Sequence, residues 1–278
     1  MKKINRRSFL AAAGLTAAAL ALTACGGSAS STASSTASSA ASSEAASTSA
    51  AAELTTVEAG KLTMATNAAF PPYEMTTDAG EFEGIDIDTA KAIAEKLGLE
   101  LQIDDMDFDA ALLSVQQGKA DIVMAGVTVT DERKAVMDFS DSYATGIQSI
   151  IVPEGSDITS PDDLAGKKIG TQRGTTGYIY CSDDFGDDAV VAYDDGLTAV
   201  QALNNGQVDA VVIDNAPAKE FVAANPGLVI LDTSYAEEDY AIGLAKGSAL
   251  EDAVNAALKE LKADGTLQSI VDKYITAE

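Results

Sequence analysis

Two short segments of this sequence resemble each other: QGKADIV at residues 117–123 and NGQVDAV at residues 205–211. Each has a glycine and an aspartate before a short apolar run, and each follows a stretch with the apolar spacing of an amphipathic helix. Gly118 and Gly206 lie 88 residues apart, which is too long for a solenoid repeat but suits two lobes of similar build. The repeat alone is compatible with coincidence, because helix, glycine and strand follow one another in many α/β proteins.

The sequence around the first segment alternates strand and helix patterns. Apolar runs predict strands near residues 62–66, 99–103 and 122–124, with a turn at the prolines after Phe70. A helix capped by Asp86 or Asp88 should end at Gly98, and a second helix should begin at Asp107 or Asp109 and run to Gly118. This order predicts an α/β fold, with parallel sheets covered by helices on both faces.

An ionic group follows each of the two repeated segments. The turn at residues 125–128 leads to Arg133, and the strand after the second segment ends at Asp214. Arg133 alone could be a solvated helix charge, and Asp214 alone could cap the helix that begins near Pro217. Ligands of open α/β sheets bind beyond the carboxyl ends of the strands, so the two lobes would place a cation and an anion across one cleft. That pair suits a zwitterion such as an α-amino acid.

The amino-terminal segment is typical of an export signal followed by a tether. A basic start and an apolar run at residues 11–22, too short to span a bilayer, predict a signal peptide over residues 1–24. Small residues precede Cys25, as in a bacterial lipobox, so we expect Cys25 to be lipidated and residues 25–55, rich in Ser and Ala, to be an unstructured tether. The pair Arg6-Arg7 is also compatible with twin-arginine export.

Composition excludes several function classes. The formal net charge is −25, and four of the 18 basic residues lie in the signal segment, so nucleic acid is not an expected partner. The chain has no histidine and only two cysteines, Cys25 and Cys181, which leaves no expected metal site, cofactor site or internal disulfide. Neither a Ser-His nor a Cys-His arrangement is available for nucleophilic catalysis.

Several longer segments of the sequence closely resemble the polar amino-acid-binding proteins of ABC importers, which have the type II periplasmic-binding fold. The resemblance covers nearly everything after the tether and is carried by TNAAFPPYE (66–74), GIDIDTAKAIAEKLG (84–98), the strip from MDFDAALL (106–113) through VMAGVTVTDER (123–133) to DFSDSYA (138–144), GKKIGTQRGTTG (166–177) and DAVVIDNAPA (209–218). It implies two doubly wound α/β lobes joined by two crossing hinge strands, with a ligand cleft between them. The first lobe would span residues 56–146 plus 242–278 and the second residues 147–241.

The resemblance also implies a function. It predicts a monomeric, lipid-anchored extracytoplasmic protein that captures a free amino acid and delivers it to an ABC permease in the membrane. Two alternatives stay open: a ligand-sensing lipoprotein without transport, and a dehydratase-type enzyme on the same fold, although the latter lacks the histidine that most often serves as general acid or base.

Individual site residues follow from the same resemblance. The position of Arg133 binds the α-carboxylate in the family and that of Asp214 accepts from the α-ammonium. The positions of Gly126, Thr128 and Thr176 assist at the carboxylate. Those of Phe70 and Phe108 form aromatic walls around the ligand. Those of Asn67 and Gln172 contact the ligand side chain, with Arg173 as a further candidate. Relatives selective for basic amino acids often have a carboxylate where this chain has Asn67. An amide there favours a polar uncharged ligand such as glutamine.

Overall fold

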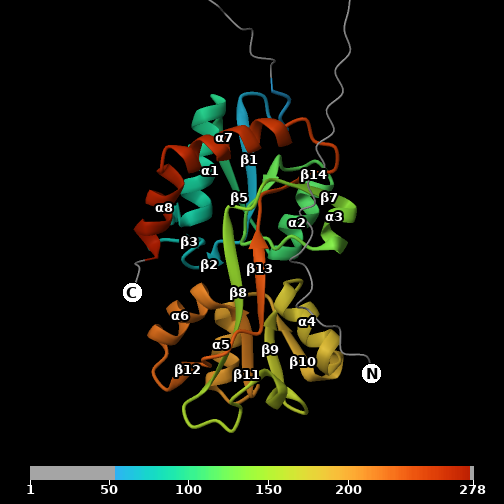
Figure 1. Cartoon of the computed structure of the whole chain (residues 1–278), viewed down its shortest axis with the longest axis vertical. Helices are drawn as coiled ribbons and strands as arrows, with labels where there is room; N and C mark the ends of the chain where they lie inside the picture. Colours follow the sequence, from blue (N-terminus) through green and yellow to red (C-terminus); the bar gives the residue numbers. More distant parts are fainter. Residues whose placement is uncertain (1–53, 276–278) are drawn as a thin grey trace, which may run out of the picture. The chain divides into compact units, whose positions relative to one another are not determined.

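The computed structural model describes residues 54–275, which form two large sheets and one small one (Figure 1). The first sheet has the strand order β5 (Glu100–Asp105), β1 (Lys61–Thr66), β6 (Ile122–Val123), β14 (Gly243–Ala245) and β7 (Met137–Phe139). The second has the order β10 (Val190–Tyr193), β9 (Ile169–Gln172), β11 (Ala210–Asp214), β8 (Ala144–Pro153) and β12 (Leu228–Ile230), and β13 (Ala236–Tyr240) also pairs with β8. The small sheet contains β2 (Ala69–Phe70), β3 (Glu74–Thr76) and β4 (Phe82–Glu83). We call the five-stranded sheet with its helices the first lobe and the six-stranded sheet with its helices the second lobe.

Helices pack on both faces of each large sheet. The helices of the first lobe are α1 (Ile85–Leu97), α2 (Phe108–Gln116), α3 (Asp131–Val136), α7 (Glu251–Ala263) and α8 (Thr266–Tyr274). Those of the second lobe are α4 (Thr176–Phe185), α5 (Gly196–Asn204) and α6 (Asn215–Ala224), with two short 3-10 helices, η1 (Pro161–Leu164) and η2 (Asp187–Ala189). Successive side chains of a strand point to opposite faces, so Leu62 and Met64 join the core under α1 and α7 while Ala65 joins the core under α2. The predicted doubly wound α/β architecture is confirmed.

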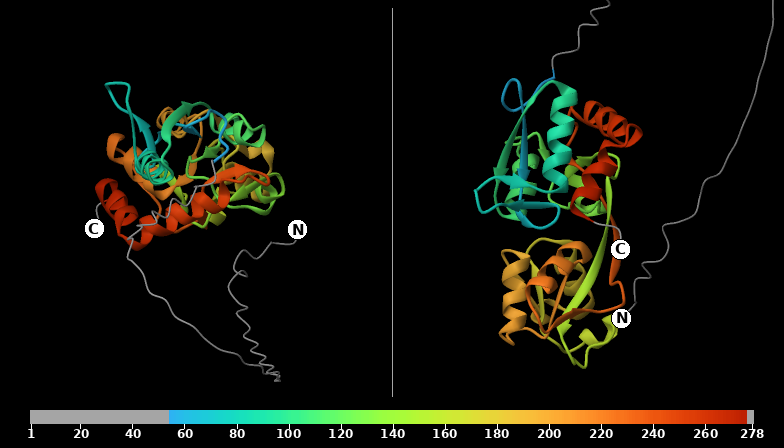
Figure 2. Two further views of the ribbon diagram at one scale, coloured as in Figure 1. Left: turned by 90° about the horizontal axis from the view of Figure 1, so that it is seen from above. Right: turned by 90° about the vertical axis from the view of Figure 1, so that its left-hand side faces the viewer.

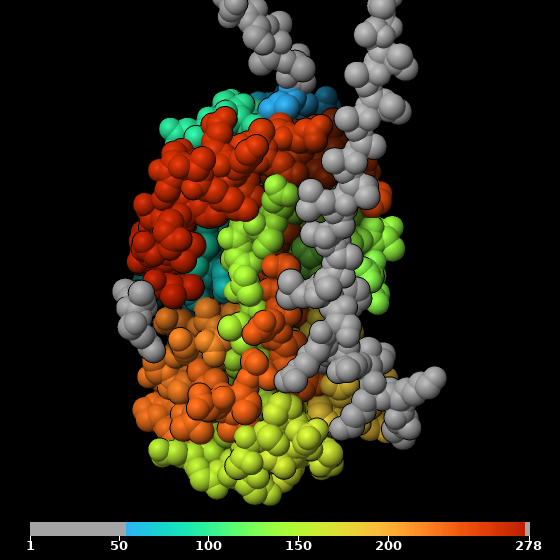
Figure 3. Space-filling model, in the orientation of Figure 1, coloured from blue at the N-terminus to red at the C-terminus, as the bar shows by residue number. Residues whose placement is uncertain are grey.

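Two strands run between the lobes. β8 leaves the first lobe and enters the second sheet, and β13 returns beside it, antiparallel, with Thr145 opposite Asp239 and Gly146 opposite Glu238. Figure 2 shows the pair running along one side of the molecule, and Figure 3 shows parts of both strands at the surface between the lobes. The lobe boundaries predicted from the sequence fall within β8 at residues 146 and 147 and just after β13 at residues 241 and 242. As residue limits of independent lobes they stay a prediction.

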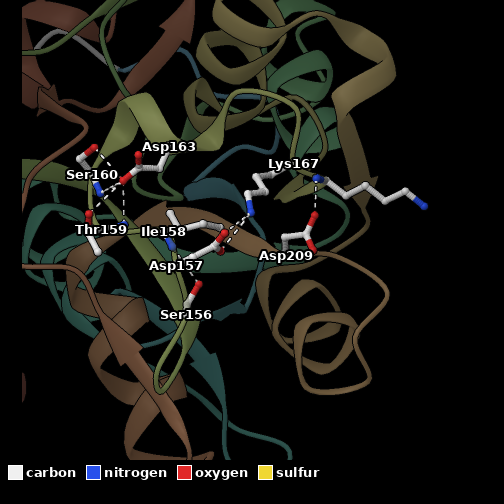
Figure 4. A network of polar contacts seen from close by, with 9 residues as sticks. Ser156, Asp157, Ile158, Thr159, Ser160, Asp163, Lys167 and Asp209 are labelled. Atoms are coloured by element: carbon white, nitrogen blue, oxygen red, sulfur yellow. Dashed lines mark hydrogen bonds and ion pairs between the residues drawn. The ribbon is translucent and has the colours of Figure 1, made fainter.

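The repeated segments do the same structural work in both lobes. Gly118 and Gly206 follow α2 and α5 with φ of 66° and 67°, a backbone conformation that favours glycine. Asp121 then forms two hydrogen bonds with the backbone of Thr63. Asp121 Oδ2 accepts from the N–H of Thr63 (2.7 Å), and the N–H of Asp121 donates to the carbonyl of Thr63 (2.9 Å). Asp209 makes the equivalent pair of hydrogen bonds with Lys168, at 2.8 Å in both directions. Figure 4 shows the hydrogen bond that the Asp209 carboxylate accepts. The glycine ends a helix and the aspartate ties the next strand to the start of its neighbour.

One predicted helix cap is wrong. Helix α1 ends as expected at Gly98, which has φ of 69°, but it is preceded by Gly84 and not capped by Asp86 or Asp88. Gly84 has φ of 133°, and a Cβ at this position would overlap the carbonyl of Tyr73. This close approach turns Asp86 into the interior, where it is fully buried. The buried aspartate is therefore available for other contacts, described below.

Within residues 54–275, the helices are all too short or too polar to span a bilayer. The predicted signal peptide, Cys25 and the tether as far as residue 53 lie outside the described residues.

Candidate functional site

A single cavity at the carboxyl ends of the strands is lined by all of the predicted ligand-binding residues. They come from both lobes: Asn67, Phe70, Phe108, Gly126, Thr128 and Arg133 from the first, and Gln172, Thr176 and Asp214 from the second. The cavity leaves about 20 Å³ for the centre of a water molecule, which is room for about one water. An amino acid is much larger, so its entry requires the lobes to part or these side chains to reorient.

Arg133 lies inside the cavity and not on a solvated helix face. Its side chain is 8% exposed, whereas its neighbours Glu132 and Lys134 are exposed. Thr130 caps α3 by accepting from the N–H of Arg133 (3.1 Å), which sets the start of this short helix. Burial lowers the pKa of the Arg133 guanidinium. The ordinary pKa of arginine lies so far above neutral pH that the group stays charged.

The guanidinium has only neutral hydrogen-bond partners among the described residues. Nη1 donates to the carbonyl of Thr128 (2.8 Å) and Nη2 to the carbonyl of Gly174 in the second lobe (3.1 Å). The ring of Phe108 lies 5.4 Å below it. None of the ion pairs between described residues involves Arg133. The carboxylates of Glu238 and Asp109 act on the guanidinium electrostatically without forming an ion pair with it. A buried cation with free N–H donors and no ion pair is suited to an anionic ligand group.

Asp214 combines two roles that the sequence left as alternatives. It caps α6 through Oδ1, which accepts from the N–H of Ala216 (3.0 Å), and Oδ2 accepts from the N–H of Ile147 on the hinge strand β8 (2.8 Å). The same carboxylate lines the cavity and is 2% exposed. Burial raises the pKa of Asp214 to about 6. Each carboxylate oxygen can accept a further hydrogen bond, so the cap leaves capacity for a cationic group.

The hydrogen bonds of Gly126 and Thr128 limit what they can offer a ligand. The N–H of Gly126 donates to Asp86 Oδ2 (3.0 Å), so it points away from the cavity and its carbonyl is the group left for a ligand. The hydroxyl of Thr128 donates to Glu238 Oε2 (3.0 Å) and lies 3.3 Å from the hydroxyl of Thr176 across the cleft. Thr176 is the first residue of α4, where backbone N–H groups and the helix dipole favour an anion.

The amides of Asn67 and Gln172 meet across the cleft. Gln172 Nε2 donates to Asn67 Oδ1 (2.8 Å), and Asn67 Nδ2 donates to the carbonyl of Met106 (3.0 Å). Both side chains are buried. Arg173, the further candidate, does not line the cavity: its side chain is 56% exposed and lies 3.7 Å from Asp194.

Aromatic rings close two sides of the cavity. Phe70 stacks on Tyr73 at 5.8 Å between centroids, and Tyr73 meets the ring of Tyr240 edge-on at 5.4 Å. A Cβ on Gly126 would lie 2.9 Å from the Phe70 ring, which is why a glycine is needed there. Phe108 belongs to the core beneath α2 and also lines the cavity, so its core and ligand-wall interpretations both describe its position.

Sequence reasoning missed the polar residues that the hinge strands and the small sheet contribute. Gln148 on β8 and Glu238 on β13 are buried and hydrogen-bonded to each other (3.0 Å), and Glu238 reaches Thr128 as well. Glu74 on β3 is fully buried and lines the cavity. The signal available for Gln148 was its place inside the apolar run GIQSIIV, where a buried amide must find a partner.

No cluster of acidic or sulfur ligands that could hold a metal ion occurs in the part of the chain that the structure describes. The cavity therefore offers one buried cation, several buried acceptors and aromatic walls, which is a binding arrangement for a small zwitterion.

Comparison with known proteins identifies the family of the chain. The family model of bacterial extracellular solute-binding proteins, family 3, matches residues 62–277. A probable histidine-binding protein of Neisseria gonorrhoeae is 32% identical over 99% of this chain and 98% of its own length, and the L-cystine-binding protein TcyJ of Escherichia coli is 33% identical over 80% of this chain and 85% of its own.

Solved structures show the same likeness. An ancestral arginine-binding protein bound to glutamine is 42% identical, with a TM-score of 0.75 over 78% of this chain and 99% of that one. The arginine-, lysine-, histidine-binding protein ArtJ of Geobacillus stearothermophilus is 35% identical, with a TM-score of 0.75 over 78% of this chain and 96% of that one. These relatives are solute-binding proteins rather than enzymes. The chain belongs to family 3 of the bacterial extracellular solute-binding proteins.

Proposed function

We propose that this protein captures a free L-amino acid in the cavity between its lobes and delivers it to an ABC permease. One observation carries the proposal: Arg133 and Asp214 are both buried, line the same cavity and form none of the ion pairs between described residues. Leaving two such charges unpaired is costly, and a zwitterion between them would satisfy both. The proposed activity is binding rather than catalysis, in preference to the dehydratase alternative.

The proposed roles follow the donors and acceptors on each side. Arg133 binds the α-carboxylate with its free N–H groups, assisted by Thr128 and by the helix amino terminus at Thr176. Asp214 accepts from the α-ammonium. Gly126, whose N–H is already donated to Asp86, would contribute its carbonyl to that ammonium.

Side-chain selectivity is proposed to lie with Asn67 and Gln172. Their amide groups can each donate and accept, so a ligand with an uncharged polar end, as in glutamine, can replace the hydrogen bond that joins them now. Phe70 and Phe108 would enclose the aliphatic stem. Arginine is the second candidate ligand, because the flat aromatic rings of Phe70 and Phe108, which line the cavity, also suit a guanidinium.

A screen of the common amino acids by thermal unfolding tests the proposal. A ligand present at about 100 times its dissociation constant adds about 2.7 kcal/mol to the free energy of unfolding of the state that binds it. We expect glutamine or a similar polar amino acid to raise the melting temperature most. If no amino acid raises it, the proposed function is wrong.

Delivery to a permease would keep the protein outside the cytoplasm, tethered by a lipid on Cys25 as a monomer. Mass spectrometry of membrane-extracted protein should find a lipidated peptide that begins at Cys25. An intact amino terminus upstream of Cys25 would contradict the anchor without affecting the binding proposal. A neighbouring pair of permease and ATPase genes would favour import over ligand sensing.

A further inference from the structure

Glu74 is a buried acid that the proposed roles do not use. It is the first residue of β3, lies opposite Phe70 in the small sheet, and is 0% exposed. It lines the same cavity as Arg133 and Asp214. A buried carboxyl group that faces a binding cavity needs a hydrogen-bond partner or a proton.

The oxygens around Glu74 lack donors. Neither Oε1 nor Oε2 of Glu74, nor Oδ1 of the adjacent Asp86, finds an N–H or O–H group among the described residues. Only Asp86 Oδ2 is satisfied, by the N–H of Gly126 (3.0 Å) and the hydroxyl of Tyr143 (2.8 Å). Two ionised carboxylates cannot hydrogen-bond to each other, but a single proton turns their contact into a hydrogen bond.

The surroundings decide which group holds that proton. The charged residues that act most strongly on Glu74 are Asp86, Asp105 and Asp214, all acidic, and burial together with Asp86 raises the pKa of Glu74 well above its ordinary value. Burial raises the pKa of Asp86 only to about 6, because the Gly126 N–H, the Tyr143 hydroxyl and Glu74 stabilise its anion. The shared proton is therefore held by Glu74 rather than by Asp86, whose anion has the better hydrogen-bond donors.

A neutral Glu74 has one oxygen left after its O–H donates to Asp86. We propose, on the basis of the proposed function, that Glu74 is a further binding residue whose remaining oxygen accepts an N–H of the ligand's ammonium group beside Asp214. An ammonium group has three N–H donors, and the carboxylate of Asp214 already accepts hydrogen bonds from the N–H groups of Ile147 and Ala216. A neutral acceptor fills the gap without adding another negative charge to the cavity.

Glu74 is assigned to the ammonium group, and not to the ligand side chain, because of the residues that surround it. The carboxylate of Asp214 acts on Glu74 electrostatically, and Asp86 links Glu74 to the backbone of Gly126. Asn67 and Gln172, the proposed side-chain contacts, hydrogen-bond to each other. Since every amino acid carries the same ammonium group, the contribution of Glu74 should be the same for every ligand that binds.

Two substitutions separate the neutral acid from an anion. In Glu74→Gln the amide N–H can donate to Asp86 and the amide oxygen can face the ligand, so we expect affinity within about threefold of the parent. In Glu74→Leu both hydrogen bonds are lost, and we expect a loss of about 10- to 100-fold. Glu83→Leu, the same change on the neighbouring strand β4 and outside the cavity, should bind like the parent.

The measurement is calorimetric titration of each variant with the amino acids that stabilise the parent, together with infrared spectroscopy at neutral pH. We expect Glu74→Leu to weaken all of them by a similar factor and expect a protonated carboxyl band in the parent that is missing from Glu74→Gln. An equal loss in Glu74→Gln, no loss in Glu74→Leu, an altered ranking of amino acids, or no such band would each overturn the inference. If Glu74→Leu does not fold, the glutamine variant and the infrared band still decide. Failure of the parent to bind any amino acid would instead refute the proposed function.

Discussion

Replacing Arg133 by alanine tests the carboxylate half of the proposed clamp. The substitution removes a guanidinium that is 8% exposed, and with it the donors that would face the ligand. Removing one partner of a buried charged pair costs about 3–5 kcal/mol. At about 1.4 kcal/mol per tenfold change in affinity, Arg133→Ala should weaken binding by about a hundredfold to a few thousandfold.

The structure adds a second effect that a conservative variant separates. Arg133 also donates to the carbonyl of Gly174 across the cleft, so alanine removes a direct link between the lobes. Arg133→Lys keeps the positive charge but not the planar fork that a carboxylate accepts with two parallel hydrogen bonds. We expect its affinity to fall between those of the parent and Arg133→Ala.

Calorimetric titration with the best ligand of the screen measures these losses, and circular dichroism checks that each variant is folded. Arg173→Ala is the matched control, because this second arginine is 56% exposed and lies outside the cavity. It should bind like the parent. If folded Arg133→Ala binds within about threefold of the parent, the ligand carboxylate is not held by Arg133 and the reasoning fails.

Four further predictions concern other residues. Because the pKa of Asp214 is raised to about 6, a proton competes with the ligand ammonium below that pH; affinity should fall by up to roughly tenfold per pH unit, and titrations of Asp214→Asn should show weak binding with no such trend. In the ligand-free protein the raised pKa makes the stabilising effect of protonated Asp214 fully present below about pH 4 and lost as the pH rises through about 6. In urea unfolding, the free energy of unfolding of the parent should therefore fall relative to that of Asp214→Asn as the pH rises from about 4 to about 6. A constant difference between the two proteins across that range would contradict the prediction. Asn67→Ala should change the ranking of amino acids in the thermal screen more than it lowers all affinities, and an unchanged ranking would remove Asn67 from the side-chain subsite. Asp121→Ala should lower the free energy of unfolding by about 1–3 kcal/mol, because it leaves the buried N–H of Thr63 without its acceptor. Asp209→Ala should lower it less, because the N–H of Lys168 is exposed and water can replace the carboxylate. Denaturant unfolding would refute this if Asp121→Ala matched the parent or if both variants lost the same amount.

The parts of the fold that could be predicted depend on local chemistry. Gly118 and Gly206 adopt a backbone conformation that favours glycine, and Asp121 and Asp209 bond to the backbone of a neighbouring strand. Such requirements restrict the residue type wherever the unit occurs, so they are visible as a repeat in the sequence. The strand and helix order followed from the same periodic patterns.

The parts that could not be predicted depend on contacts between distant segments. Glu238 lies in the acidic run EEDY, which resembles a solvated surface. Its burial follows from the register of β13 against β8, which turns Glu238 toward Gln148 and Thr128. The burial of Asp86 likewise depends on a contact between distant segments. The sequence favoured a helix cap for Asp86, and only the close approach of Gly84 to the backbone of Tyr73 shows that Asp86 points inward.

Titration of the parent with L-glutamine and two of its analogues tests the central claim most directly. One analogue, glutaramic acid, lacks the amino group, and the other, 4-aminobutanamide, lacks the carboxylate, while both keep the amide end. The zwitterion clamp of Arg133 and Asp214 predicts measurable binding of L-glutamine and a loss of about a hundredfold or more for either analogue, because each leaves one buried charge without its partner. Binding of either analogue as tight as that of L-glutamine would contradict the account.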